Sequence, residues 1–257
     1  MKLPISVFII TKDEEERLPR AINSVKGWVD EIIVIDSGST DRTVEIAKDL
    51  GALVVFNEWK GFGAQKIFGE GLCRNKWVLN IDADEEITEG LKNNIINLFK
   101  NGEPGESCFK MFWKMLFLTD EKPPVLGLTG RFVRFYNKEK AGFRDSTIHD
   151  SVIVKNGGKI GVLNGFVYHR CFKGLKHWAD KINVYSTMQA EEWVAKQRPM
   201  PGFRIVIEPF LAFFKSYFIR RYVVYGIDGI TASMMYAYSK TLRLAKVREL
   251  YKLKKNS

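Results

Sequence analysis

Four short apolar runs dominate the first hundred residues of the chain, and each is followed by a segment whose apolar side chains have helical spacing. The interiors of these runs are almost free of polar residues. The runs span residues 5–11, 31–36, 52–57 and 76–82. Strands of this kind are buried on both faces, and a helix between consecutive strands makes the strands run parallel. The pattern therefore predicts an α/β fold whose parallel sheet is flanked by helices.

The pattern changes after Gly105, where long aromatic segments follow one another without intervening helices. Extended segments are predicted at residues 108–118, 130–137, 146–154 and 158–169. We expect them to add an antiparallel or mixed extension to the sheet. From Lys173 onward, apolar residues recur every three or four positions, which predicts helices. The chain is therefore divided into residues 1–172 and a helical C-terminal region, residues 173–257.

The net charge of +10 on this 257-residue chain is concentrated in the helical region. From Phe203 to the C-terminus, 11 Lys and Arg residues stand against three acidic ones. They lie among long apolar runs without a nucleic-acid-binding motif, so a nucleic-acid partner is disfavoured. Basic helices with an apolar face are typical of proteins that bind the surface of an anionic membrane. The alternative is that these helices pack on the body of the protein and leave a solvated basic face.

The cysteines and the N-terminus indicate a cytoplasmic protein. Cys73, Cys108 and Cys171 lie far apart, and their spacing fits neither a disulfide framework nor a zinc site. The first apolar run is too short for a signal peptide. No stretch offers the roughly 18 uncharged apolar residues of a membrane-spanning helix.

Polar side chains follow the ends of the four predicted parallel strands. These residues are Thr11, Asp36, Asn57 and Asp82. Ligands of open α/β sheets bind at the carboxyl ends of the strands, so two acids at this edge suggest a ligand. For Asp36 the alternative is a structural role, in a turn or with Ser39, Thr40 or Asp41 at the start of the next helix.

A second acid, Asp84, follows Asp82 after one alanine. In an extended segment this spacing places both carboxylates on the same side. Together they are candidate ligands of a hard divalent cation, Mg²⁺ or Mn²⁺, whose shell is often completed by substrate phosphates. The chain has no glycine-rich phosphate loop of the common types, so a cation would take over the neutralisation of a leaving diphosphate.

These segments resemble the family 2 glycosyltransferases of GT-A fold. The resemblance is carried, in order, by "VFIITKDEEERLPRAINSV", "EIIVIDSGSTDRTVEIAKDLGA" and "WVLNIDADEEIT". It implies a GT-A mixed sheet flanked by helices, a nucleotide-sugar donor, an Asp-x-Asp metal site and inversion at the sugar carbon. Two positions depart from the pattern: Asp13 stands where many members carry asparagine, and Ser37 where many carry a second aspartate.

Residue by residue, the resemblance implies a donor site and a metal site. The positions implied for the nucleotide sugar are Thr11, Glu14, Asp36, Lys66 and Asp82. Asp84 is implied as the metal ligand. A carboxylate at Asp36 has the right chemistry to accept the N3–H of uracil, which favours a uridine nucleotide.

Two histidine-containing segments of the second half add candidates. An inverting transfer needs a general base for the acceptor hydroxyl, and Asp150 matches the acidic residue that the family carries in this region. His149 either orients Asp150 or is itself the base; a surface turn is the alternative. His169 ends a predicted strand, where some GT-A enzymes complete their metal shell with a histidine; a core histidine is the alternative.

The whole pattern is similar to bacterial lipopolysaccharide-core glucosyltransferases, and this resemblance covers most of the chain. This similarity implies UDP-glucose as donor and a phosphorylated, lipid-linked saccharide as acceptor, with Arg131, Arg134 and Arg144 reading acceptor phosphates. We expect residues 1–172 to be catalytic. Residues 173–257 are expected to dock the acceptor and the cytoplasmic face of the inner membrane. The alternative hypothesis is a non-catalytic sensor or scaffold that binds sugar nucleotides.

Overall fold

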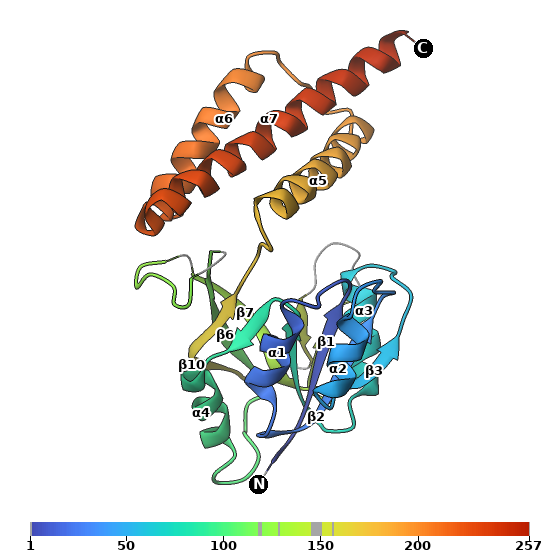
Figure 1. Ribbon diagram of the computed structural model, residues 1–257, viewed down its shortest axis with the longest axis vertical. Coiled ribbons are helices and arrows are strands. Elements are labelled where there is room, and N and C mark those ends of the chain that lie inside the picture. Colours follow the sequence, from blue (N-terminus) through green and yellow to red (C-terminus); the bar gives the residue numbers. More distant parts are fainter. Residues whose placement is uncertain (1, 118–119, 128, 145–150, 156, 257) are drawn as a thin grey trace. The chain divides into compact units, whose positions relative to one another are not determined.

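The computed structural model describes residues 2–117, 120–127, 129–144, 151–155 and 157–256. The chain folds into two compact units, which are described separately. The α/β unit comprises Met1–Lys114 and Thr129–His169, and the helical unit comprises Met115–Leu128 and Arg170–Ser257. Figure 1 shows both units.

The α/β unit is built on an eight-stranded sheet with the strand order β3-β2-β1-β4-β7-β6-β10-β5. The first four strands along the chain are mutually parallel, and they are β1 (Leu3–Thr11), β2 (Val29–Asp36), β3 (Leu53–Phe56) and β4 (Trp77–Asp82). Helices separate them and follow β4, namely α1 (Leu18–Val25), α2 (Thr43–Asp49), α3 (Phe62–Leu72) and α4 (Glu89–Leu98). The predicted alternation of strands and helices is confirmed.

The aromatic segments add the antiparallel part of the sheet. They form β6 (Cys108–Met115), β7 (Thr129–Asn137) and β10 (Ile160–His169), with the short β5 (Glu85–Ile87) at the sheet edge. Strand β7 is antiparallel to β4 and β6, and β10 is antiparallel to β5. A separate ribbon pairs β8 (Ala141–Phe143) with β9 (Val152–Val154). The predicted mixed sheet flanked by helices is therefore confirmed.

The two faces of the sheet explain why its strands lack polar alternation. On β1, Val7 and Ile9 pack into the core formed with α1, α2 and α4, whereas Phe8 and Ile10 point into the opposite core. That second core lies beneath α3, where a Cβ on Gly69 would come within 2.7 Å of side chains on β1 and β2. Both faces of β1 are buried because helices cover both of them.

Within the described residues, the part of the helical unit that follows Arg170 contains three α-helices and two short helical turns. They are α5 (Leu175–Ala195), α6 (Arg204–Phe214), the π-helical η1 (Lys215–Ile219), the 3₁₀ η2 (Tyr222–Tyr225) and α7 (Gly226–Asn256). Helix α7 packs against both α5 and α6. Among the described helices, none combines the length and the hydrophobicity needed to cross a bilayer.

Candidate active site

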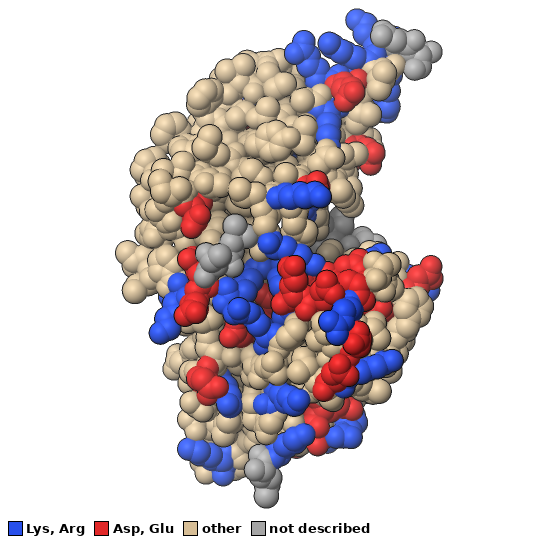
Figure 2. All heavy atoms as spheres, in the orientation of Figure 1, with Lys and Arg blue, Asp and Glu red and all other residues tan. Residues whose placement is uncertain are grey.

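The acidic strand ends converge on the tip of β1. Strand β1 lies between β2 and β4, with Thr11 paired to Asp36 on one side and Ile10 paired to Asp82 on the other. All three strands are parallel, so their carboxyl ends share one edge of the sheet. Acidic and basic side chains gather at this end of the α/β unit (Figure 2).

Asp36 shapes the loop that follows β2. Its carboxylate accepts hydrogen bonds from the amides of Gly38 and Ser39, at 2.8 and 3.0 Å, and from the Ser39 hydroxyl at 2.5 Å. Gly38 has a φ of +92°, a conformation that favours glycine. Asp36 therefore has the structural role in a turn that was the alternative for this residue, whereas Asp41 holds the start of α2 by accepting from the Thr43 amide at 2.9 Å.

Beside Asp36, Thr11 offers a hydroxyl without a partner. This residue is 5% exposed, and within the described part of the chain its Oγ1 forms no hydrogen bond. Because a buried hydroxyl without a partner is costly, its placement here suggests a ligand.

The two positions that depart from the family pattern form hydrogen bonds within the site, Asp13 with the loop after β2 and Ser37 with α3. Asp13 Oδ1 accepts from the Thr40 amide at 2.7 Å, and Ser37 Oγ accepts from Gln65 Nε2 at 2.9 Å. Both substitutions are therefore accommodated by hydrogen bonds within the site.

Two buried cations hold Asp82. Lys66 of α3 is fully buried, and its Nζ lies 2.9 Å from Asp82 Oδ1. Arg134 of β7 approaches both carboxylate oxygens at 3.4 Å and also donates to Asn80. Burial alone would raise the pKa of Asp82, but Arg134 and then Lys66 outweigh burial and hold that pKa well below its usual range. Asp82 is therefore a carboxylate at neutral pH.

Asp84 lies in a second cluster of charges. Ala83 and Asp84 form a turn between β4 and β5, so the extended geometry assumed from the sequence is wrong at this point. Asp84 Oδ2 lies 3.4 Å from His169 Nε2 and 3.4 Å from an Arg17 nitrogen. Burial would raise the pKa of Asp84, but the hydrogen bond and charge of His169, together with Arg17, lower it.

Three functional candidates were missed by sequence reasoning. Arg17 connects Asp84 to Glu14, whose carboxylate it contacts at 2.5 and 2.7 Å.

Glu85 is buried, and its carboxylate accepts from the Asp82 amide at 2.9 Å. Burial, followed by repulsion from Asp82, raises the pKa of Glu85. Asn80 donates to the Phe8 carbonyl oxygen and accepts from Arg134. Only Asn80 carried a sequence signal, as a polar residue inside an apolar strand.

The Asp84–His169 pair fits a divalent cation. A carboxylate oxygen and an imidazole nitrogen 3.4 Å apart are ligand types that Mn²⁺ accepts, and carboxylate oxygens suit Mg²⁺. Within the described residues, no group of three or more His, Cys, Asp or Glu side chains is arranged to hold a metal ion. A cation at this pair would therefore need further ligands from a substrate.

The predicted acceptor-binding residues Arg131 and Arg144 are exposed, and the predicted base lies outside the described residues. Arg131 is exposed on β7, with its Cζ 5.0 Å from the centre of the Phe112 ring. Arg144 is exposed after β8, and its amide donates to the Ser151 carbonyl oxygen. His149 and Asp150 lie outside the described residues.

In an open α/β sheet, ligands bind at the carboxyl ends of the strands, and the acids that end β2 and β4 on either side of β1 suit a phosphorylated ligand bound through a cation. Residues 6–152 match Glycosyl transferase family 2, and the chain belongs to this family. The family predicted from the sequence is thereby confirmed.

Similar proteins cover nearly the whole chain. An uncharacterized glycosyltransferase of Rickettsia prowazekii is 42% identical over 254 residues, which are 96% of this chain and 87% of the relative. The lipopolysaccharide core biosynthesis glycosyltransferase LpsC of Rhizobium meliloti is 26% identical over 98% of this chain and 95% of its own. Among solved structures, glucosyl-3-phosphoglycerate synthase from Mycobacterium tuberculosis is 28% identical over 45% of this chain and 44% of its own, with a TM-score of 0.35.

Proposed function

We propose that this glycosyltransferase is metal-dependent and inverting, and that it moves glucose from UDP-glucose to a lipid-linked saccharide of the lipopolysaccharide inner core. One observation carries the proposal: Asp36 and Asp82 end the two strands that flank β1, and Asp84 follows within the same site. The similarity to a lipopolysaccharide core biosynthesis glycosyltransferase supports the acceptor class.

The donor would bind across the tip of β1. Thr11 has a buried hydroxyl without a partner in the described chain, and Asp36 beside it offers carboxylate oxygens to the N3–H of uracil. Glu14, Lys66 and Asp82 complete the proposed donor site. Lys66 and Arg134 keep Asp82 charged, so that its oxygens accept hydrogen bonds from the ribose hydroxyls.

Asp84 and His169 would hold Mg²⁺ or Mn²⁺. When bound, the cation neutralises the charge that develops on the departing diphosphate. Against the opposing effect of burial, His169 and then Arg17 lower the pKa of Asp84, so its carboxylate is charged, as a hard cation requires.

The transfer itself needs a base on the acceptor side. The acceptor oxygen bonds to the anomeric carbon as the bond to UDP breaks, and the hydroxyl proton passes to the base. Asp150 is the proposed base, with His149 as its partner or replacement. Arg131, Arg134 and Arg144 are the proposed contacts of acceptor phosphates; Arg134 would share its guanidinium with Asp82.

Helix α6 supports a membrane surface as the partner of the helical unit. Its apolar side chains form an exposed row that continues into η1, here called the α6 stripe. Each is between 47% and 64% exposed, and they are Phe203, Val206, Ile207, Phe210, Leu211, Phe214 and Phe218. Figure 2 shows a broad area without Lys, Arg, Asp or Glu on the helical unit.

The polar side of α6 faces its own unit. Glu208 is paired with Arg204 of the same helix and with Arg243 of α7, the latter at 2.9 Å, and Ala212 is buried. A helix of a water-exposed surface has the opposite arrangement, with apolar residues inside. Lys215 and Arg221 are exposed next to the stripe and suit anionic headgroups. The stripe supports a peripheral membrane contact, and we propose the cytoplasmic face of the inner membrane as its location.

The experiment is the release of UDP from a panel of UDP-sugars with Mg²⁺ or Mn²⁺, without acceptor. A transferase releases UDP slowly by hydrolysis, fastest from its own donor, whereas a non-catalytic sensor binds the nucleotide and releases none. Asp84→Ala should abolish the metal-dependent release. Full metal-dependent turnover in this variant would refute the site assignment.

A further inference from the structure

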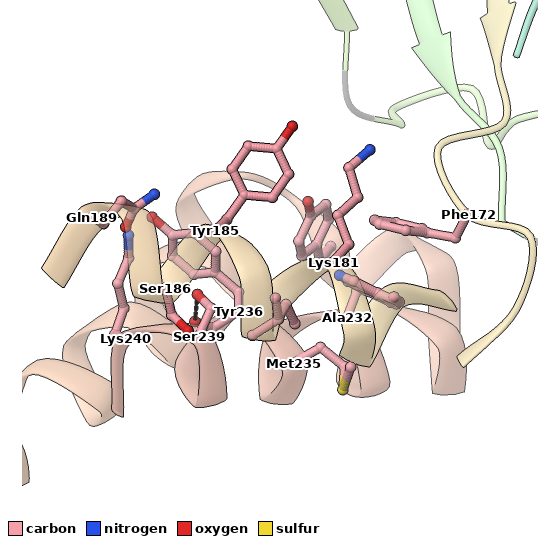
Figure 3. A pocket seen from close by; sticks show the side chains of 13 residues that line it. Phe172, Lys181, Tyr185, Ser186, Gln189, Ala232, Met235, Tyr236, Ser239 and Lys240 are labelled. Atoms are coloured by element: carbon pink, nitrogen blue, oxygen red, sulfur yellow. Dashed lines mark hydrogen bonds between the residues drawn. The ribbon is translucent and has the colours of Figure 1, made fainter. Parts of the chain in front are cut away.

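The helical unit contains a cavity that the proposed reaction does not use. It lies along α5 and α7, has a volume of about 280 Å³ and is also lined by Tyr222 of η2. This volume is close to the lower end of small-ligand sites, about 300–1,000 Å³. Figure 3 shows the side chains of both helices that line it, with Lys181 near Phe172 and Lys240 near Gln189.

Aromatic rings supply most of the lining. Phe172 and Trp178 stack at 3.8 Å with an interplanar angle of 16°, which leaves a rigid aromatic platform. Tyr185 of α5, Tyr222 of η2 and Tyr236 of α7 complete the aromatic lining. Such rings offer flat faces to the C–H surface of a sugar ring, and the tyrosines add hydroxyl groups.

Two lysines give the cavity a positive charge. Lys181 comes from α5 and Lys240 from α7, and their Nζ atoms lie 6.0 and 4.9 Å from the centres of the Tyr185 and Tyr236 rings. Neither has an acidic partner within the described part of the chain, and no described lining residue is acidic. Arg220 lies over the same Tyr236 ring at 4.6 Å. Cations without counter-charges favour an anionic ligand.

A neutral polar group completes the site. Gln189 of α5 is exposed and lines the cavity. Its N–H and carbonyl groups suit the paired donor and acceptor character of sugar hydroxyls. The cavity therefore combines aromatic faces, an amide and unpaired lysines, whereas a purely aliphatic ligand would leave the lysines and the amide unused.

We propose that this α5–α7 pocket binds a phosphorylated sugar, with the sugar ring on the aromatic residues, the phosphate on Lys181 at the Phe172 end, and a sugar hydroxyl on Lys240 at the Gln189 end. The role of that sugar rests on the proposed function: it would be a unit of the acceptor saccharide, held by the helical unit. Binding itself does not depend on catalysis, so the pocket and the reaction can be tested separately.

The test is titration calorimetry of the full chain with glucose 6-phosphate as probe. Glucose, inorganic phosphate and glycerol 3-phosphate are compared, the last representing a lipid headgroup without a sugar ring. Glucose 6-phosphate should bind at least about tenfold more tightly than each of them, because only it offers both the ring and the charge. Equal binding of glycerol 3-phosphate or inorganic phosphate would overturn the proposal in favour of simple phosphate binding.

Variants locate the binding. Lys181→Ala and Lys240→Ala should each weaken glucose 6-phosphate binding about tenfold, whereas the charge-preserving Lys240→Arg should remain within about threefold. The matched control is Lys176→Ala, an exposed lysine of α5 outside the pocket.

Asp84→Asn tests whether the probe occupies the donor site instead. Loss of binding in Asp84→Asn, or equal binding in the Lys176 and Lys181 variants, would overturn the proposal. Absent UDP release with intact pocket binding would refute only the proposed reaction.

Discussion

The two units differ in the exposure of their apolar side chains. In the α/β unit, Val7, Phe8 and Ile9 of β1 are all buried, and the charged groups converge at the strand ends. In the helical unit, Phe210 and Leu211 are 64% and 62% exposed while the Glu208 ion pairs lie on the inner side of α6. Leaving such side chains in water forgoes about 1.5–3 kcal/mol each. The α/β unit is thus suited to a polar, water-soluble ligand, whereas the outer face of α6 is suited to an apolar partner.

The largest expected effect is a loss of transfer activity that leaves membrane binding unchanged. Asp150→Ala should lower transfer to a saccharide acceptor by about 10²–10⁴-fold, because the acceptor hydroxyl would lose its general base. UDP release without acceptor and vesicle binding should stay close to those of the unchanged chain. If His149→Ala has the larger effect on transfer, His149 is the base.

The second prediction concerns the buried charge pair of the α/β unit. Lys66→Met should destabilise the fold by about 3 kcal/mol at pH 7, because it removes the fully buried partner of Asp82. The matched control is Lys76→Met, whose ion pair with Glu139 at 3.3 Å is more than half exposed. That control should change stability by less than about 1 kcal/mol. Urea unfolding of both variants measures the difference.

The same pair gives a pH dependence with a defined sign. The pKa of Asp82 is lower in the folded chain than in the unfolded one, so its stabilisation is present above the ordinary carboxyl pKa, near 4. It is lost as the pH falls through the lower folded pKa. The gap in stability between the unchanged chain and Lys66→Met should therefore narrow between pH 5 and about pH 2. A gap that widens on acidification would contradict this assignment.

The third prediction addresses the α6 stripe. Replacing Phe210 and Phe214 together by serine should weaken binding to vesicles of anionic phospholipid by roughly 100-fold, since each phenyl ring contributes apolar burial of about 1.5 kcal/mol or more. UDP release should be unchanged. Co-sedimentation measures the binding, and Val184→Ser, an exposed apolar position on α5, is the control. Unchanged sedimentation of the double variant would leave the stripe without a membrane role.

The smallest expected effect comes from the basic end of α7. Lys252, Lys254 and Lys255 are exposed, and their joint replacement by glutamine should weaken vesicle binding about tenfold at low salt. The difference should nearly disappear in high salt, because these charges are screened. Leu244 and Val247 of the same helix are buried, so replacing the three lysines is a cleaner test than deleting the helix from Leu244 onward. Binding that is insensitive to both changes would favour the solvated-face interpretation.

The fold could be predicted from the sequence where a simple periodicity reports burial. The parallel strands were recognisable because both faces of each are covered, and Asp36 and Asp82 were recognisable because an acid ends an apolar run. The place of β5 was not predictable, since it follows β4 in sequence but pairs with β10 at the sheet edge. Its position depends on long-range pairing.

The site was predictable only in part, for the same reason. Arg17 and Arg134 contact Asp84 and Asp82 across 67 and 52 residues of sequence, and no local pattern reports such pairs. The turn at Ala83 contains no glycine or proline, so the sequence gives no sign of it. The outward-facing α6 stripe also gives the same helical periodicity as a buried one, because spacing identifies a face of a helix and not its surroundings.

The most direct test of the central claim is the binding of UDP with and without Mn²⁺, measured by calorimetry on the unchanged chain and three variants. If Asp36 and Asp84 serve one bound diphosphate nucleotide, Mn²⁺ should tighten UDP binding in the unchanged chain. Asp84→Asn should lose this enhancement, and Asp36→Asn should weaken UDP binding with or without the metal. Asp49→Asn, an exposed acid on α2, is the control and should behave as the unchanged chain. Full Mn²⁺ enhancement in Asp84→Asn, or unaltered UDP binding in Asp36→Asn, would contradict the account.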